Sequence, residues 1–260
     1  MITYNLLNKH NEIAHFCTSR EGGVSVGNYA SFNLSPFCGD APESLLRNQQ
    51  ILYDRLDINL ERLIIPYQNH GTEIRIIDDD FFQLTDESKQ QYLNGIDALY
   101  TSLPGVCIGV TTADCVPLLF FDQVKQVVAA AHAGWRGTCG RIAEKTIRRL
   151  VEVHKCSVKD ILVVIGPSIS CKVYEVGVDV IDSFKAAGFD VSNICEQSGD
   201  SFFLDLWEAN QQSLEKAGIP AENIEIAGLC TFTHPDHFFS ARRLGIKSGR
   251  MLSGIMIKKA

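Results

Sequence analysis

The amino-acid sequence predicts a single domain of mixed α/β (α+β) class over residues 1–260, with mixed rather than purely parallel sheets. Short apolar runs of β type are interspersed with amphipathic helical segments along the whole chain. Several of the β-type runs follow one another without a helix between them, which indicates hairpins and therefore antiparallel pairs. No repeat, low-complexity tract or linker rich in proline and serine divides the sequence.

Four segments carry apolar residues at helical spacing and are predicted to be helices that cover the sheets. The second of them follows a Gly-Trp-Arg-Gly turn. The third and fourth end at a glycine, which suits the left-handed conformation of a helix C-cap. The predicted helices span residues 42–56, 140–154, 176–189 and 205–219.

The predicted strands are short apolar runs, many of them rich in β-branched and aromatic residues. They span residues 12–18, 62–68, 73–78, 98–102, 106–112, 116–122, 126–132, 161–167, 202–206, 224–231 and 238–243.

The charge balance limits the classes of partner. The chain has 24 Lys and Arg against 31 Asp and Glu, for a net charge of −7. General binding of nucleic acid depends on neutralising phosphates and is therefore not expected. A small anionic substrate remains possible, because a few local arginines can bind one.

The expected compartment is the cytoplasm. The first residues do not form a signal peptide, and no run reaches the roughly 20 apolar residues of a membrane helix. The nine cysteines are scattered along the chain, and no two of them are spaced as a CxxC motif. In a reducing compartment, we expect most of them to be buried thiols rather than disulfides.

Potential metal ligands flank the two most apolar runs. Cys115 precedes the run VPLLFF, and His132 follows the run VVAAA. If a two-residue turn at 123–124 joins the strands, Asp122 faces Lys125 and Cys115 lies directly opposite His132. Their Cβ atoms would then be roughly 5 Å apart, whereas a one-residue slip would place them on opposite faces. The pair is therefore a candidate for two ligands of one metal.

A catalytic zinc site typically has three protein ligands and one open position. The best third candidate is His70 in PYQNHG, which follows an apolar run and precedes Gly71. A purely structural role for His70 is the alternative. The other histidines lie in the N-terminal segment, at a helix end and in the polar HPDH loop, at positions 10, 15, 154, 234 and 237.

A set of motifs in a fixed order resembles the laccase-domain proteins, also called YfiH-type or polyphenol-oxidase-like proteins. The resemblance runs over nearly the whole chain, and TADC together with AHAGWRG is its most specific part. The motifs are SREGGVS, SFNLS, QNHG, DALYT, TADCVPLL, AAHAGWRG, IGPSISCKVYEVG, LDLWEANQQSL and CTFTHPDHFFSARR.

The resemblance implies a layered α/β/β/α sandwich and one metal ion, usually zinc, with copper possible. Its ligands would be His70, Cys115 and His132. The implied activity is phosphorolysis of adenosine, inosine, guanosine and methylthioadenosine to base and pentose 1-phosphate, with adenosine deamination as a companion activity. The chain would act as a monomer or homodimer. QNHG carries Asn69 where the family usually has Val, a change that bears on the pocket wall rather than on the ligand.

The remaining site residues are hypotheses about support and substrate. Asp97 and Asp114 are the candidates for orienting the imidazole ligands, as carboxylates commonly do. A phosphate-binding site needs cationic side chains. Some arginines of this chain lie beside glycines or at a predicted helix start, where backbone N–H groups can also bind an anion. The candidates for binding phosphate or substrate are Arg20, Arg136, Tyr174, Arg242 and Arg243.

Three other functions compete with this interpretation. The first is a polyphenol oxidase, as the family's older name suggests. Seven histidines and no H-x-H pair disfavour a multicopper cluster, but a single site with two histidines and one cysteine could still bind copper. A metal-free hydrolase could use Cys115 as nucleophile and His132 as base. A non-enzymatic binding protein is the third alternative.

Overall fold

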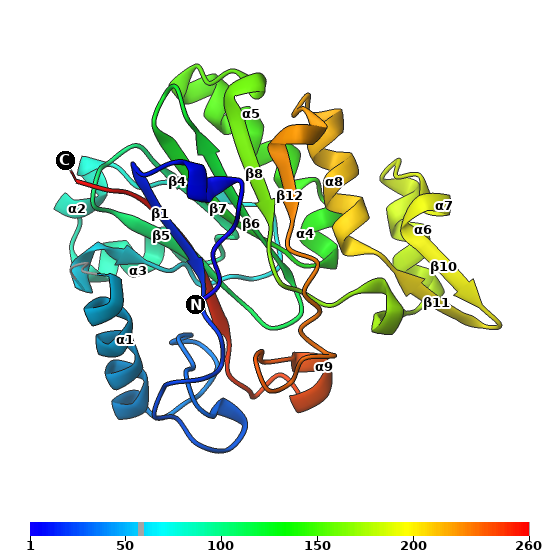
Figure 1. The fold of residues 1–260 in the computed structure, drawn as a ribbon, viewed down its shortest axis with the longest axis horizontal. Coiled ribbons are helices and arrows are strands. Elements are labelled where there is room, and N and C mark those ends of the chain that lie inside the picture. Colours follow the sequence, from blue (N-terminus) through cyan, green and yellow to red (C-terminus); the bar gives the residue numbers. More distant parts are fainter. Residues whose placement is uncertain (57–59, 260) are drawn as a thin grey trace.

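The computed structural model describes residues 1–56 and 60–259. Figure 1 shows α1 on one side of the strands and α4, α5 and α8 on the other. The helices are α1 Pro42–Leu56, α2 Asp79–Gln83, α3 Asp86–Tyr92, α4 Trp135–Cys139, α5 Ile142–His154, α6 Val178–Ala186, α7 Val191–Ile194, α8 Leu206–Lys216 and α9 Ala241–Leu244. The strands are β1 Ile13–Cys17, β2 Leu63–Ile64, β3 Ile74–Ile76, β4 Ala98–Thr101, β5 Cys107–Thr112, β6 Val116–Asp122, β7 Val127–Ala133, β8 Ile161–Ile165, β9 Glu175–Val176, β10 Cys195–Ser198, β11 Ser201–Leu204, β12 Ile224–Ile226 and β13 Met251–Ile257.

The strands form two large mixed sheets and one small sheet. The six-stranded sheet has the order β12-β8-β6-β7-β4-β3, and the four-stranded sheet has the order β1-β13-β5-β2. The three-stranded sheet is β10-β11-β9. Pairs β2–β5, β3–β4 and β12–β8 are parallel, while β6 is antiparallel to both β7 and β8. The prediction of mixed sheets is confirmed.

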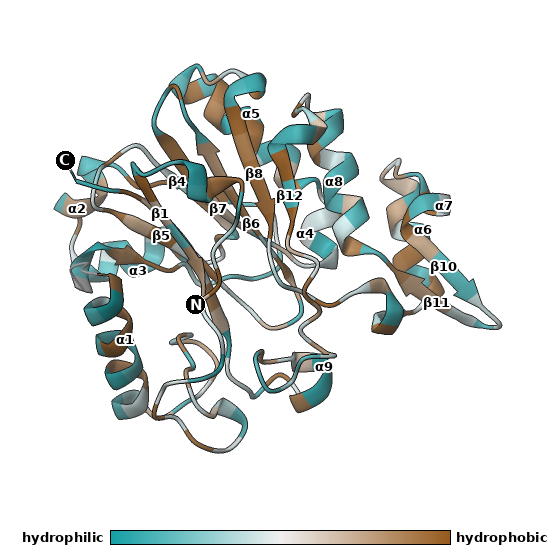
Figure 2. Ribbon diagram, viewed as in Figure 1, coloured by the Kyte–Doolittle hydropathy of each residue, from teal (hydrophilic) through white to brown (hydrophobic). Residues whose placement is uncertain are grey.

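Alternation along β6 explains how the two large sheets and their helices form layers. Leu118 and Phe120 join the core cluster that also contains residues of α5, α6 and α8, whereas Leu119 and Phe121 join the cluster shared with the four-stranded sheet. All four side chains are at most 1% exposed. Because successive strand residues point to opposite faces, one strand can serve two cores. Figure 2 shows this sheet as largely apolar.

Helix α1 completes the fourth layer. Its Leu52 packs with Phe16, Leu252 and Met256 of the four-stranded sheet in a separate core cluster. The order of layers is therefore helices, six-stranded sheet, four-stranded sheet and α1. This is the α/β/β/α sandwich that the resemblance implied.

The predicted helices all form, but the strand prediction is wrong at residues 238–243 and misses strands β9, β10 and β13. Residues 238–243 are not a strand, because the Ser240 side chain accepts a hydrogen bond from the Arg243 N–H and caps helix α9. Strand β13 was not predicted, although it lies in the interior of its sheet between β1 and β5. The missing side chain of Gly254 leaves room there for the ring of Phe16.

The register of the β6–β7 hairpin also differs from the prediction. Asp122 pairs with Val127 and Pro117 pairs with His132, so the turn contains the four residues 123–126 rather than two. The Asp122 carboxylate causes this, since it accepts hydrogen bonds from the N–H groups of Val124 and Lys125 at 2.9 and 2.7 Å. Cys115 therefore lies diagonally rather than directly opposite His132, and an even shift keeps both on the same face.

All nine cysteines are unpaired in the structure. Four are buried and the other five are half-buried, so burial is less general than expected. None of the helices in the described ranges is long and apolar enough to cross a membrane.

Candidate metal centre

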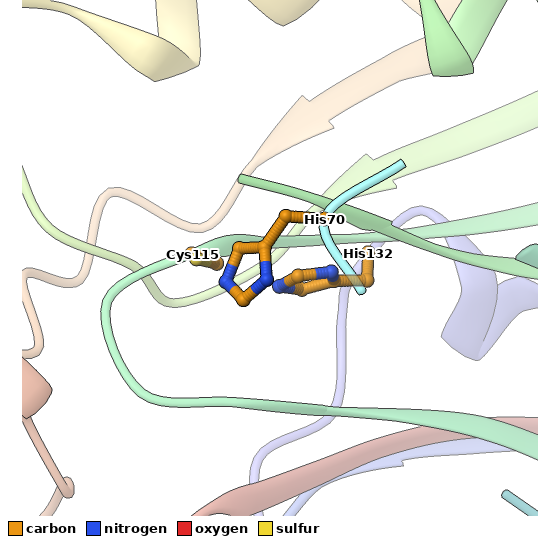
Figure 3. A group of neighbouring side chains, drawn as sticks. All are labelled: His70, Cys115 and His132. Atoms are coloured by element: carbon orange, nitrogen blue, oxygen red, sulfur yellow. The ribbon is translucent and has the colours of Figure 1, made fainter. Parts of the chain in front are cut away.

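Three side chains from separate parts of the chain converge at one end of the six-stranded sheet. His70 lies between β2 and β3, Cys115 lies just before β6, and His132 is on β7. Their ligand atoms all lie within 4.8 Å of one another. Figure 3 shows the two rings and the thiol gathered at one point. Among the described residues this is the one such group of three or more.

Asp97 connects two of these three residues. Its Oδ1 atom lies 2.7 Å from Nδ1 of His132 and 3.0 Å from the backbone N of His70. Its Oδ2 atom accepts hydrogen bonds from the N–H groups of Gly71 and Asn69. Asp97 is fully buried. An imidazole that donates from Nδ1 presents Nε2 as its free ligand atom, so Asp97 fixes the orientation of His132.

The loop that carries His70 adopts a backbone conformation that needs this support. His70 has a φ of 63°, in the left-handed region that non-glycine residues rarely occupy. The carboxylate of Asp97 accepts from three successive N–H groups, at residues 69, 70 and 71. These hydrogen bonds hold the loop in the conformation that points the His70 ring toward Cys115.

The segment before Cys115 is anchored by two different side chains. Gln68 clamps Thr111, because its Nε2 donates to the Thr111 carbonyl and its Oε1 accepts from the Thr111 N–H. Asp114 accepts hydrogen bonds from the hydroxyls of Thr231 and Ser240 and from the backbone N–H of Arg242. The two predicted carboxylates therefore differ: Asp97 contacts the imidazole ring of His132, whereas Asp114 ties the Cys115 loop to residues 231–242.

Gly134 leaves the space that the three side chains occupy. A Cβ atom at this position would lie 3.0 Å from both Cys115 Sγ and His70 Cδ2, and 3.7 Å from His132 Cε1. The two distances of 3.0 Å are shorter than ordinary van der Waals contacts. The glycine in AHAGWRG therefore allows the ligand atoms to approach one another.

The electrostatics of the cluster favour a thiolate. Burial alone raises the pKa of Cys115, but the charge of His132 and the hydrogen bonds with His132 and His70 outweigh it and lower that pKa. Burial alone lowers the pKa of His132, but Cys115 and Asp97 together raise it. Burial raises the pKa of Asp97, but hydrogen bonds from His132, Gly71 and Asn69 bring it below its usual value. Thiolate is the form of cysteine that binds metals.

The cluster opens into a cavity of about 610 Å³, a volume typical of small-molecule sites. Phe37 and Tyr67 form an edge-to-face aromatic pair there, with ring centroids 5.1 Å apart. The side chains are 48% and 47% exposed, so they are available to a ligand. The lining residues are Ser35, Phe37, Cys38, Gly39, Tyr67, Gln68, His70, Thr111, Thr112, Ala113, Cys115, His132, Ala241, Ile246, Lys247 and Arg250.

The predicted substrate residues lie outside the lining of this cavity. Arg20 donates to the carbonyls of Ala30 and Pro235, and Arg243 donates to the carbonyl of Phe232. Both guanidinium groups therefore hold loops of the protein. Asn69 does not line the cavity either; its side chain accepts from the Gly71 N–H.

Tyr174 does not line the cavity, but it interacts electrostatically with Cys115, Arg242 and Arg136. Burial and then the negative charge of Cys115 raise the pKa of Tyr174 to about 12, while Arg242 and Arg136 oppose the rise. Arg242 stacks over Tyr174 and donates to the Glu175 carbonyl, and exposed Arg136 stacks over Trp135. These groups are near the cluster, and their role in binding substrate stays a prediction.

Sequence reasoning did not identify Phe37, Tyr67, Lys247 or Arg250 as site residues. Tyr67 had a signal, since it lies three residues before His70 in the same motif. Phe37, Lys247 and Arg250 come from segments far from the ligands in sequence, and only the fold brings them to the cavity.

Comparison with known proteins identifies the family. The family model described as "Multi-copper polyphenol oxidoreductase laccase" matches residues 14–258. The chain belongs to this family. Within it, the chain is 45% identical over 262 residues to a purine nucleoside phosphorylase of Bacteroides thetaiotaomicron, covering 100% of this chain and 97% of that protein.

Two further members of this laccase-like family are informative. Adenosine deaminase RL5, from an unknown prokaryotic organism, is 39% identical, with coverage of 94% of this chain and 93% of the relative. The crystal structure of the hypothetical protein YfiH of Bacillus licheniformis superposes with a TM-score of 0.89 at 31% identity, covering 95% of this chain and 94% of that one. The resemblance inferred from the motifs and the mixed α/β fold are both confirmed.

Proposed function

We propose that this protein is a zinc-dependent purine nucleoside phosphorylase that also deaminates adenosine. The observation that carries the proposal is the convergence of His70, Cys115 and His132 within 4.8 Å beside a cavity of about 610 Å³. Relatives named as a purine nucleoside phosphorylase and as an adenosine deaminase, at 45% and 39% identity, support this choice of reactions.

The residues present fit a single metal ion. Two imidazoles and one thiolate are a donor set that zinc accepts, with a fourth position left for water or substrate. Copper also binds such donors. The space above Gly134 and the hydrogen bond from His132 to Asp97 are what a preorganised site requires. When bound, the metal supplies positive charge that stabilises negative charge on the substrate or lowers the pKa of a water molecule.

The chain's own residues would perform the remaining work. Phosphorolysis forms a bond between a phosphate oxygen and C1′ of the ribose while the bond from C1′ to the purine nitrogen breaks. The purine leaves with the bonding electrons and takes up a proton. The half-exposed rings of Phe37 and Tyr67 offer an apolar aromatic surface for the base. Thr112 lines the cavity, and its Oγ1 is a buried atom without a hydrogen-bond partner among the described residues.

The rival functions fit the geometry less well. A multicopper cluster needs several groups of ligands, whereas one group of three is present in residues 1–56 and 60–259. A metal-free hydrolase would use Cys115 and His132 but leaves no task for His70, whose ring centroid is 4.8 Å from that of His132.

The test is to incubate the purified protein with inosine or adenosine, with and without phosphate, and to follow release of the free base. The proposal predicts base release that requires phosphate and disappears in Cys115→Ala. It also predicts conversion of adenosine to inosine without phosphate. Base release that is independent of phosphate, or the absence of any release, would contradict the phosphorylase assignment.

A further inference from the structure

The cavity beside the cluster is lined by cationic side chains, although the protein as a whole is acidic. The chain carries a net charge of −7, yet the described residues that line the cavity include no aspartate or glutamate. They do include Lys247 and Arg250. A concave surface with cations and no carboxylates attracts anions, because the low-dielectric walls concentrate the field.

The two cations have different roles. The Arg250 guanidinium donates to the carbonyls of Ser248, Gly249 and Ile246, so its donors hold the turn that contains Lys247. Lys247 is exposed and has no hydrogen-bond or ion-pair partner within the described part of the chain. Its ammonium group keeps all three donors available to a ligand.

The position of Lys247 suits the second substrate of a phosphorylase. A phosphate that attacks the ribose must lie in the same cavity as the nucleoside, and Lys247 shares that cavity with the cluster and the Phe37–Tyr67 pair. The guanidinium groups of Arg20 and Arg242 donate to backbone carbonyls and lie outside its lining. Lys247 is therefore the cation with free donors at the place where phosphate is needed.

On the basis of the proposed phosphorylase function, we propose that Lys247 binds the phosphate co-substrate and that Arg250 positions it by holding the 246–250 turn. Deamination of adenosine uses water and needs no phosphate. Loss of the Lys247 charge should therefore weaken phosphorolysis and leave adenosine deamination at the same site unchanged.

The experiment compares Lys247→Gln with the wild-type protein in both assays. We expect the KM for phosphate in inosine phosphorolysis to rise about 10- to 100-fold, the loss associated with a charged hydrogen bond. The KM for inosine at saturating phosphate and the rate of adenosine deamination should stay within about twofold. Lys247→Arg keeps the charge and should restore most of the affinity for phosphate. Lys216→Gln, an exposed lysine at the end of α8, is the matched control.

Calorimetric titration of inorganic phosphate into each variant provides a readout independent of turnover, and should show weaker binding in Lys247→Gln alone. An unchanged KM for phosphate in Lys247→Gln would overturn the proposal. So would an equal loss of both reactions, or a rise in that KM caused by Arg136→Gln instead. If the wild-type protein shows no phosphorolysis, the proposed function fails, which the wild-type assay reveals before any variant is made.

Discussion

Replacing Asp97 with asparagine should be more damaging than its near-identical shape suggests. Asp97 accepts four hydrogen bonds through its carboxylate, two at each oxygen: from His132 Nδ1 and His70 N at Oδ1, and from Gly71 N and Asn69 N at Oδ2. An asparagine amide can accept at only one of these two positions. In either orientation its NH₂ group faces two donors, which lose their acceptor.

The expected magnitude follows from that count. Each unsatisfied donor in a buried site costs about 1–3 kcal/mol, so Asp97→Asn should lower the free energy of unfolding of metal-free protein by about 2–6 kcal/mol. Loss of a group that orients a ligand ring typically weakens metal binding about 10- to 100-fold. Urea unfolding in the presence of a chelator measures the first effect, and competition with a chromophoric chelator measures the second.

The matched control is Asp200→Asn, which removes a carboxylate from the exposed turn between β10 and β11. It should change neither quantity beyond error. A free energy of unfolding within about 0.5 kcal/mol of the wild type, together with unchanged zinc affinity in Asp97→Asn, would contradict this role of Asp97.

Three more predictions concern the same site. Gly134→Ala places a methyl group 3.0 Å from Cys115 Sγ, so the zinc affinity measured by chelator competition should fall at least about tenfold. If the variant instead binds zinc as tightly as the wild type, the three side chains do not need the space at Gly134. Because the pKa of Cys115 is lowered, iodoacetamide should still alkylate it in zinc-free protein well below about pH 8.5, the usual pKa of a free thiol, and bound zinc should block the reaction. An alkylation rate with its pH midpoint at about 8.5 would contradict a Cys115 thiolate. Phe37→Ala and Tyr67→Ala should each raise the KM for inosine about tenfold, because an aromatic contact to the base is lost, with little change in urea unfolding; an unchanged KM would place the base elsewhere.

The Cys115–His132 pair could be predicted from sequence because strand periodicity is robust. The predicted turn was two residues too short, since nothing in the sequence alone shows that the Asp122 side chain closes a four-residue turn. An even shift preserves the face on which each side chain lies, so the pair remained close. An odd shift would have separated the two residues.

His70 and Lys247 show where sequence reasoning stops. His70 itself has the left-handed backbone conformation, and Asp97, which is distant in the sequence, stabilises it by accepting a hydrogen bond from the His70 N–H. The ring of His70 reaches the cluster only because of this contact. Lys247 is one of 24 basic residues, and its role depends on which loop the fold brings to the cavity. Arginines beside glycines in the sequence were plausible anion ligands, but in the fold Arg20 instead donates to the backbone carbonyls of Ala30 and the distant Pro235. Long-range tertiary contacts decide these roles.

The most direct test of the account is to titrate zinc into chelator-treated protein while measuring phosphate-dependent release of hypoxanthine from inosine. We predict that activity rises linearly and stops rising at one equivalent of zinc per chain, and that His70→Ala shows no recovery over the same range. Full activity in the zinc-free protein, or recovery in His70→Ala equal to that of the wild type, would contradict a function that depends on a metal held by His70, Cys115 and His132.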